Sequence, residues 1–131
     1  MTDNTAHTII AMEQAAMDRW IKGDPDGFLE ISAEDVVYFD PFQERRLNGH
    51  AELKQYYDSF RGSVHIDRYE FLEPKVQCTD SMAVFTFNFV SNIKEKVDRW
   101  NCTEVYRLQP DGRWKIIQSH WSYTKPNLQP D

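Results

Sequence analysis

The sequence predicts an α+β fold, in which helices pack on one face of a mainly antiparallel sheet. Helical apolar spacing fills much of the first half of the chain, and long β-prone segments separated by turns fill the second half. No internal repeat, low-complexity segment or linker divides the 131 residues, which are enough for one core of ordinary size. We therefore expect a single domain over residues 1–131.

Three helices are predicted from apolar spacing and from their ends. The first covers roughly residues 6–22, ends at Gly23, and shows apolar side chains at helical spacing: Ile9, Met12, Ala16 and Trp20. Asp24 and Pro25 then suit the cap and first turn of a second helix. The third helix follows Gly49, and its apolar side chains stand at i, i+3, i+4 and i+7: Leu53, Tyr56, Tyr57 and Phe60.

The strands are predicted from β-branched and aromatic residues between turn signals. A short run at 36–40 is stopped by Pro41. Four longer strands follow at about 64–76, 82–93, 99–109 and 113–123. The charged stretch 94–96 and the Pro-Asp-Gly at 110–112 are expected to form hairpin turns between them.

Charge and composition limit the possible partners. A net charge of -6 argues against nucleic acid, because phosphates require a basic surface. No apolar run approaches the ~20 residues of a membrane span, and the N-terminus lacks a signal-peptide layout. Cys78 and Cys102 lack Cys-x-x-Cys spacing and are expected to be reduced thiols. We expect a cytoplasmic protein with no nucleic-acid or membrane partner.

Metal and cofactor motifs are missing from the sequence. No two histidines stand near a carboxylate at metal-ligand spacing, and there is no glycine-rich phosphate loop. We therefore expect neither a metal nor a cofactor.

Two carboxylates stand out because they fall on strand faces that are otherwise apolar. Glu104 shares a face with Cys102 and Tyr106, and Asp40 shares one with Tyr38. A buried carboxylate either finds a partner or has its pKa raised, and a raised pKa suits general acid–base chemistry near neutral pH.

Structural roles are the alternative for both acids. Asp40 precedes a proline, where aspartate often hydrogen-bonds the turn backbone. Glu104 can pair with an arginine or lie at a subunit contact, and the candidate arginines are Arg45, Arg46 and Arg68.

Two strand faces are less clear in the sequence. In the segment 64–76, either His65 and Asp67 or Val64 and Ile66 point inward. His120 is expected on the strand face of Trp114, Ile116 and Gln118, opposite to Trp121, in a structural or interface role.

The junctions between these elements resemble those of the nuclear transport factor 2-like superfamily, and of its ketosteroid isomerase and SnoaL-like members in particular. The resemblance is carried by Gly-Asp-Pro-Asp-Gly at 23–27, Tyr-Phe-Asp-Pro at 38–41, Gly49 and the aromatic-rich strands from 85 to 123. The segment 111–122 also resembles the association domain of calcium/calmodulin kinase II. The resemblance implies a cone-shaped roll, with a curved sheet and three covering N-terminal helices around an apolar pocket.

The same resemblance implies roles for individual residues. Asp40 matches the catalytic base of the isomerase, Glu104 falls near its protonated oxyanion-hole acid, and Tyr57 matches a supporting tyrosine. Ala16 stands where the family has its oxyanion-donor tyrosine, which weakens the tie to steroid isomerisation. The expected ligand-binding residues are Trp20, Tyr38, Phe42, His65, Phe85, Phe87, Phe89, Tyr106, Trp121 and Tyr123.

Two classes of function are compatible with this pattern. The first is a cofactor-free isomerase, hydratase or cyclase that acts on a small, apolar carbonyl compound through Asp40. The alternative is a non-catalytic domain of the same fold that binds a small apolar ligand or serves in oligomerisation. In either case we expect a homodimer through the outer face of the sheet.

Overall fold

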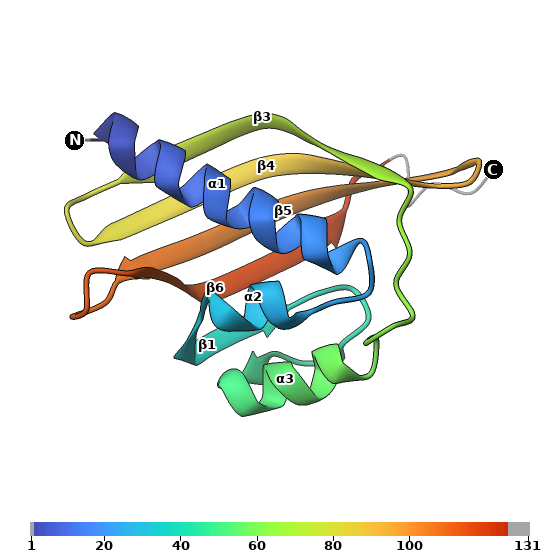
Figure 1. Cartoon of the computed structure of the whole chain (residues 1–131), viewed down its shortest axis with the longest axis horizontal. Helices are drawn as coiled ribbons and strands as arrows, with labels where there is room; N and C mark the ends of the chain where they lie inside the picture. Colours follow the sequence, from blue (N-terminus) through green and yellow to red (C-terminus); the bar gives the residue numbers. More distant parts are fainter. Residues whose placement is uncertain (1, 126–131) are drawn as a thin grey trace.

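The computed structural model describes residues 2–125, which form three helices and one six-stranded sheet (Figure 1). The helices are α1 (Thr2–Trp20), α2 (Asp26–Glu30) and α3 (His50–Asp58). The strands are β1 (Ser32–Phe39), β2 (Leu47–Asn48), β3 (Arg68–Cys78), β4 (Met82–Ile93), β5 (Lys96–Leu108) and β6 (Trp114–Tyr123).

The strand order in the sheet is β2-β1-β6-β5-β4-β3. β1 and β6 run parallel, and all other neighbouring pairs are antiparallel. α1 crosses one face of the sheet, while α3 packs on β1 beside α2 (Figure 1). The predicted α+β class, with helices first and a mainly antiparallel sheet after them, is confirmed.

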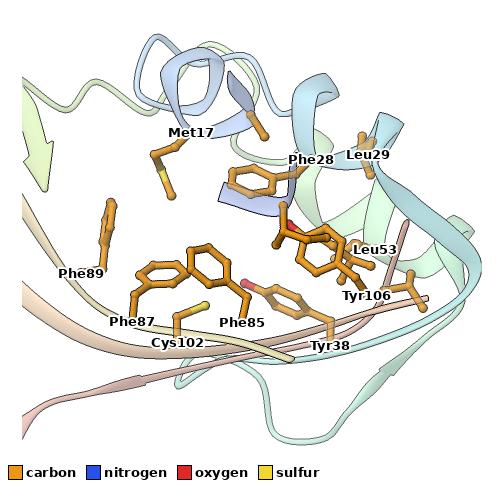
Figure 2. Close-up of a cluster of buried hydrophobic side chains, with 14 of the residues drawn as sticks. Met17, Phe28, Leu29, Tyr38, Leu53, Phe85, Phe87, Phe89, Cys102 and Tyr106 are labelled. Atoms are coloured by element: carbon orange, nitrogen blue, oxygen red, sulfur yellow. The ribbon is translucent and has the colours of Figure 1, made fainter. Parts of the chain in front are cut away.

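The core lies between the helices and the inner face of the sheet. Side chains alternate along β4, so that Phe85, Phe87 and Phe89 are all buried on this face. Figure 2 shows these three rings side by side on the sheet, with Met17 of α1 and Phe28 of α2 above them. The phenylalanines at alternate positions of this strand therefore mark the covered face of the sheet.

α1 and α2 touch through their backbones. A Cβ atom added to Gly27 would stand 2.9 Å from the Cα of Ala16, a distance that real Cβ atoms do not reach. Ala16 is accordingly buried, with 2% of its surface exposed. The close helix crossing therefore requires glycine at position 27, where a side chain would meet the backbone of Ala16.

Several element ends differ from the sequence-based expectation. β1 begins at Ser32, four residues before the expected 36, and the two-residue strand β2 was not expected, because two residues carry no periodic signal. The expectation of a strand from 64 was wrong, since β3 starts at Arg68. Before it, the Ile66 amide donates to the Ile21 carbonyl, so this segment follows the end of α1 rather than a neighbouring strand.

A β-bulge in β6 overturns the expected face of His120. The register shifts so that Tyr106 pairs with Ile116 while Val105 pairs with Gln118, leaving one extra residue in β6. Ile116 and Ser119 are both buried as a result, and His120 is exposed. His120 therefore does not share the face of Ile116, and its ring instead stands 4.9 Å from that of Phe39.

The described residues add two further facts. Within 2–125, none of the helices is long and apolar enough to cross a membrane. Cys78 on β3 and Cys102 on β5 are both free thiols, in line with the sequence. The homodimer through the outer sheet face stays a prediction.

Candidate functional site

A cavity of about 660 Å³ lies at the end of the core where α1, α3 and the β4–β5 hairpin meet the segment 63–66. Its volume is in the range that small-molecule sites usually have. Nine of the residues expected at a ligand or catalytic site line it: Trp20, Tyr38, Asp40, Phe42, Tyr57, His65, Phe89, Trp121 and Tyr123.

Aromatic rings form most of the inner wall. Trp20 packs edge-on against Tyr57 with ring centroids 5.0 Å apart, and Tyr38 packs edge-on against Tyr57 at 5.6 Å. Trp121 meets Phe89 in the same way at 5.5 Å. Interlocked rings of this kind hold a fixed shape, so the cavity is preformed for an apolar body.

Asp40 is a half-buried acidic group in the cavity wall. The hydroxyl of Tyr38 donates to its Oδ2 at 2.8 Å, and the hydroxyl of Tyr56 donates to the same oxygen at 2.5 Å. The backbone amide of Phe42 donates to Oδ1 at 2.8 Å. Oδ2 therefore accepts two hydrogen bonds and Oδ1 accepts one, so Oδ1 has more acceptor capacity left.

The phenols around Asp40 remain protonated. Burial raises the pKa of Tyr38 and of Tyr57 well above 10, and nearby negative charges add to this. Burial and the hydrogen bond to Asp40 also raise the pKa of Tyr56. All three hydroxyls can therefore act as hydrogen-bond donors near neutral pH.

A second acidic group lies behind the cavity, in the core. Glu13 on α1 and Glu104 on β5 are both fully buried, and they are hydrogen-bonding neighbours. Tyr106 donates to Glu13 Oε1 at 2.6 Å, and Ser119 donates to Glu104 Oε2 at 2.7 Å. The remaining oxygens, Glu13 Oε2 and Glu104 Oε1, receive no donor from another described residue.

One shared proton satisfies this pair. Burial and the neighbouring Glu104 charge raise the pKa of Glu13 well above 4.5, and burial also raises the pKa of Glu104. A proton held between the two carboxyls, on the oxygens that lack another donor, gives every oxygen of the pair a partner. The pair then carries one negative charge instead of two.

Four expected site residues do not line the cavity. These are Glu104, Phe85, Phe87 and Tyr106, which belong to the packed core behind it. Glu104, which the resemblance implied to be a site residue, therefore lies behind the cavity: strand alternation identifies the side chains that face inward, but not how deeply the helices cover each one. Nor does Glu104 pair with an arginine, since its acidic neighbour is Glu13.

Sequence reasoning missed two residues of this region. Tyr56 was assigned only to helix packing, although it stands next to Tyr57 and donates to Asp40. Glu13 was not selected at all, although it follows Ile9 by four residues and precedes Met17 by four. That spacing places it on the buried stripe of α1, and an acid on such a stripe was the available signal.

The family's oxyanion tyrosine has no counterpart on α1. The cavity-lining side chains of this helix are Met17 and Trp20, and neither carries a hydroxyl. The hydroxyls around Asp40 come instead from β1 and α3, as Tyr38, Tyr56 and Tyr57. Among residues 2–125, no three His, Cys, Asp or Glu side chains are grouped as metal ligands.

Comparisons with known proteins agree with this architecture. Residues 14–117 match the family model of the SnoaL-like domain. The structure is similar to that of a protein of Parabacteroides distasonis ATCC 8503, provisionally named a ketosteroid isomerase, with a TM-score of 0.83 and 44% identity over 91% of this chain and 87% of that one. No curated protein matches the chain.

More distant structures share the fold alone. An NTF2-like protein of Streptomyces avermitilis, provisionally named a dehydratase, has a TM-score of 0.74 and 20% identity over 95% of this chain and 99% of that one. The CaMKII hub of S. rosetta has a TM-score of 0.74 and 19% identity over 90% and 95%. The chain belongs to the SnoaL-like domain family, within the NTF2-like superfamily.

Proposed function

We propose that this protein is a cofactor-free acid–base enzyme that moves a proton next to the carbonyl group of a small, mostly apolar compound. The observation that carries the proposal is the Asp40 carboxylate in the wall of an aromatic cavity, with phenol hydroxyls beside it. Base and oxygen-polarising donors are then within reach of one bound carbonyl compound.

Asp40 serves as the base. Its Oδ2 already accepts two phenol hydrogens, whereas Oδ1 accepts only the Phe42 amide and retains a lone pair. A carbon acid bound against the rings of Tyr57 and Phe89 can transfer its α-proton to this oxygen. The electron pair of the broken C–H bond then moves to the carbonyl oxygen, which becomes an enolate.

The tyrosine hydroxyls near Asp40 can donate hydrogen bonds to whichever oxygen carries the negative charge. Before the proton moves, Tyr38 and Tyr56 donate their hydroxyl hydrogens to the Asp40 carboxylate. Once Asp40 holds the proton, charge-assisted hydrogen bonds to it are lost and the negative charge lies on the substrate oxygen. A hydroxyl that turns from Asp40 to that oxygen, or the hydroxyl of Tyr57, stabilises the enolate. Asp40 then returns the proton to another carbon.

The 44% identical relative supports the same class of reaction, since it carries the provisional name of a ketosteroid isomerase. A steroid is not implied for this chain, because the tyrosine of that family's first helix is replaced by Ala16, which faces α2. The proposal is therefore limited to a small carbonyl compound.

The test is the conversion of 3-cyclohexen-1-one into its conjugated isomer, followed by the ultraviolet absorbance of the product. Asp40→Asn should lower the rate by about 10²–10⁴-fold, the usual contribution of a general base. Asp80→Asn, in the exposed turn before β4, is the matched control and should leave the rate unchanged. Circular dichroism and urea denaturation check that both variants fold.

An unchanged rate in Asp40→Asn would show that Asp40 is not the base. If the wild-type protein binds apolar compounds in this cavity but converts none of them, the alternative function applies, which is a domain that binds a small apolar ligand.

A further inference from the structure

We infer that the mouth of this cavity is a subsite for an anionic group, so that the ligand is an amphipathic compound with an apolar carbonyl body and a carboxylate or similar anion. The inference rests on the proposed use of the cavity as a binding site for a carbonyl compound. It adds the chemistry of the part of the ligand that does not react.

The cavity wall changes character from its inner end to its mouth. The lining residues of the inner end are buried and mostly aromatic or apolar, as Met17, Tyr57 and Phe89 are. The exposed lining residues include three basic side chains: His65, Lys94 and Lys96. The chain as a whole has a net charge of -6, so basic side chains at the entrance of this cavity differ from the overall charge of the protein.

The two carboxylates that line this cavity, Asp40 and Asp98, have partners within the described residues. Asp40 accepts three hydrogen bonds, from Tyr38, Tyr56 and the Phe42 amide. Asp98, with 17% of its side chain exposed, stands 3.8 Å from the Lys96 ammonium, a long and solvent-screened ion pair. In the part of the chain that the structure describes, no ion pair involves Lys94, so its ammonium is available to a ligand.

The backbone of Lys94 shows that this residue is not the natural choice for its turn. Lys94 has a φ of 56°, and it occupies the first position of the two-residue turn between the paired Ile93 and Lys96. Glycine is preferred there, because a side chain at positive φ is strained. The turn therefore presents the Lys94 side chain at a cost in backbone strain.

The surrounding contacts fix the turn against the opposite side of the mouth. The Lys94 amide donates to the Asp67 carboxylate at 2.6 Å, and the Asp67 amide donates to the Asn92 carbonyl at 2.8 Å. Asp67 directly follows the segment 63–66, which carries His65 and lines the cavity. The two sides of the mouth are therefore tied together, and the basic groups stand over one opening.

A pair of dyes with the same apolar body tests the subsite. 1-Anilinonaphthalene-8-sulfonate carries a sulfonate, and N-phenyl-1-naphthylamine lacks it. Both are titrated by fluorescence into the wild-type protein and into a Lys94→Gly/Lys96→Gln double variant. The double variant should bind the sulfonate dye roughly two- to tenfold more weakly, the usual effect of losing exposed ion pairs, and the neutral dye equally well.

Two controls separate this result from general effects. Lys22→Gln/Lys75→Gln removes two exposed lysines outside the cavity wall and should leave both dyes unaffected. Lys94→Gly relieves the positive φ, so the thermal midpoint of the double variant should not fall, and unfolding cannot imitate the expected result. In the wild-type protein, high salt should also lower the affinity for the sulfonate dye relative to that for the neutral dye.

The other outcomes overturn the inference. If the double variant binds both dyes equally more weakly, the two lysines only shape the cavity. If its affinity for the sulfonate dye is unchanged, the lysines do not contact the anion. A lower affinity of the Lys22→Gln/Lys75→Gln control for the sulfonate dye would mean that the dye is attracted nonspecifically to surface charge. If neither dye binds the wild-type protein, the subsite is excluded. The Asp40→Asn turnover test decides the proposed function separately, because it uses an uncharged ketone.

Discussion

Tyr106 on β5 donates its hydroxyl hydrogen to Glu13 on α1 across 2.6 Å, inside the core. Through Glu13 the contact continues to Glu104, and from there to Ser119 on β6. α1 is thus joined to two strands by one buried polar network. Because α1 also supplies Met17 and Trp20 to the cavity wall, the network helps to set the shape of the site.

The shared proton predicts a specific pH dependence of stability. The pKa of Glu13 is raised in the folded protein above the 4.5 of an unperturbed glutamate. The folded chain therefore holds a proton that the unfolded chain releases above about pH 4.5. Stability is fully present below that pH, and it falls as the pH rises toward the folded-state pKa, by at most about 1.4 kcal/mol per pH unit.

Glu13→Gln tests this dependence. A glutamine amide can replace the shared proton as a donor to Glu104, and its oxygen can still accept from Tyr106. Relative to the wild-type protein, the variant should gain free energy of unfolding between pH 5 and pH 8, measured by urea denaturation. Glu70→Gln, an exposed control on β3, should change nothing. A constant difference between wild type and Glu13→Gln across this range would exclude a shared proton.

The core and the cavity wall should respond differently to truncation. Phe87 is packed behind the cavity, so Phe87→Ala should lower the free energy of unfolding by about 3–5 kcal/mol but leave the affinity of the folded protein for N-phenyl-1-naphthylamine unchanged. Trp20 lines the cavity, so Trp20→Ala should weaken this binding on the order of tenfold. If Phe87→Ala weakens binding as much as Trp20→Ala, Phe87 belongs to the site after all.

The close crossing of α1 and α2 predicts that Gly27→Ala is destabilising. Helix propensity alone would favour alanine by about 1 kcal/mol. The new Cβ would lie 2.9 Å from the Ala16 Cα, however, so one helix has to move. We expect a net loss of about 1–3 kcal/mol in urea denaturation. A more stable variant would show that the helices do not approach this closely in solution.

Much of the site could be predicted from the sequence, because side-chain alternation identifies the inner face of each strand. Asp40 and Glu104 were both found as acids on apolar faces. Alternation does not give the depth of a side chain: Glu104 is fully buried in the core, whereas Asp40 is half-buried in the cavity wall, and this depends on where the helices cover the sheet. Glu13 was missed because a single acid on a helix is ambiguous until its face is known.

The pairing register of the strands also could not be predicted from the sequence. The bulge in β6 reverses the side-chain alternation between Ile116 and His120, and only the pairing with β5 defines it. The segment 64–67 has a β-prone composition, but Ile66 bonds to the end of α1. Both features depend on contacts between residues far apart in the sequence, which a local pattern does not contain.

The central claim is that Asp40 removes a proton beside a carbonyl group bound in the aromatic cavity. The most direct measurement is proton NMR of 2-decalone in D₂O, which follows the exchange of its α-protons for deuterium without requiring a complete reaction. The wild-type protein should accelerate this exchange, and Asp40→Asn, folded to the same extent, should not. Equal acceleration by both proteins would contradict the account.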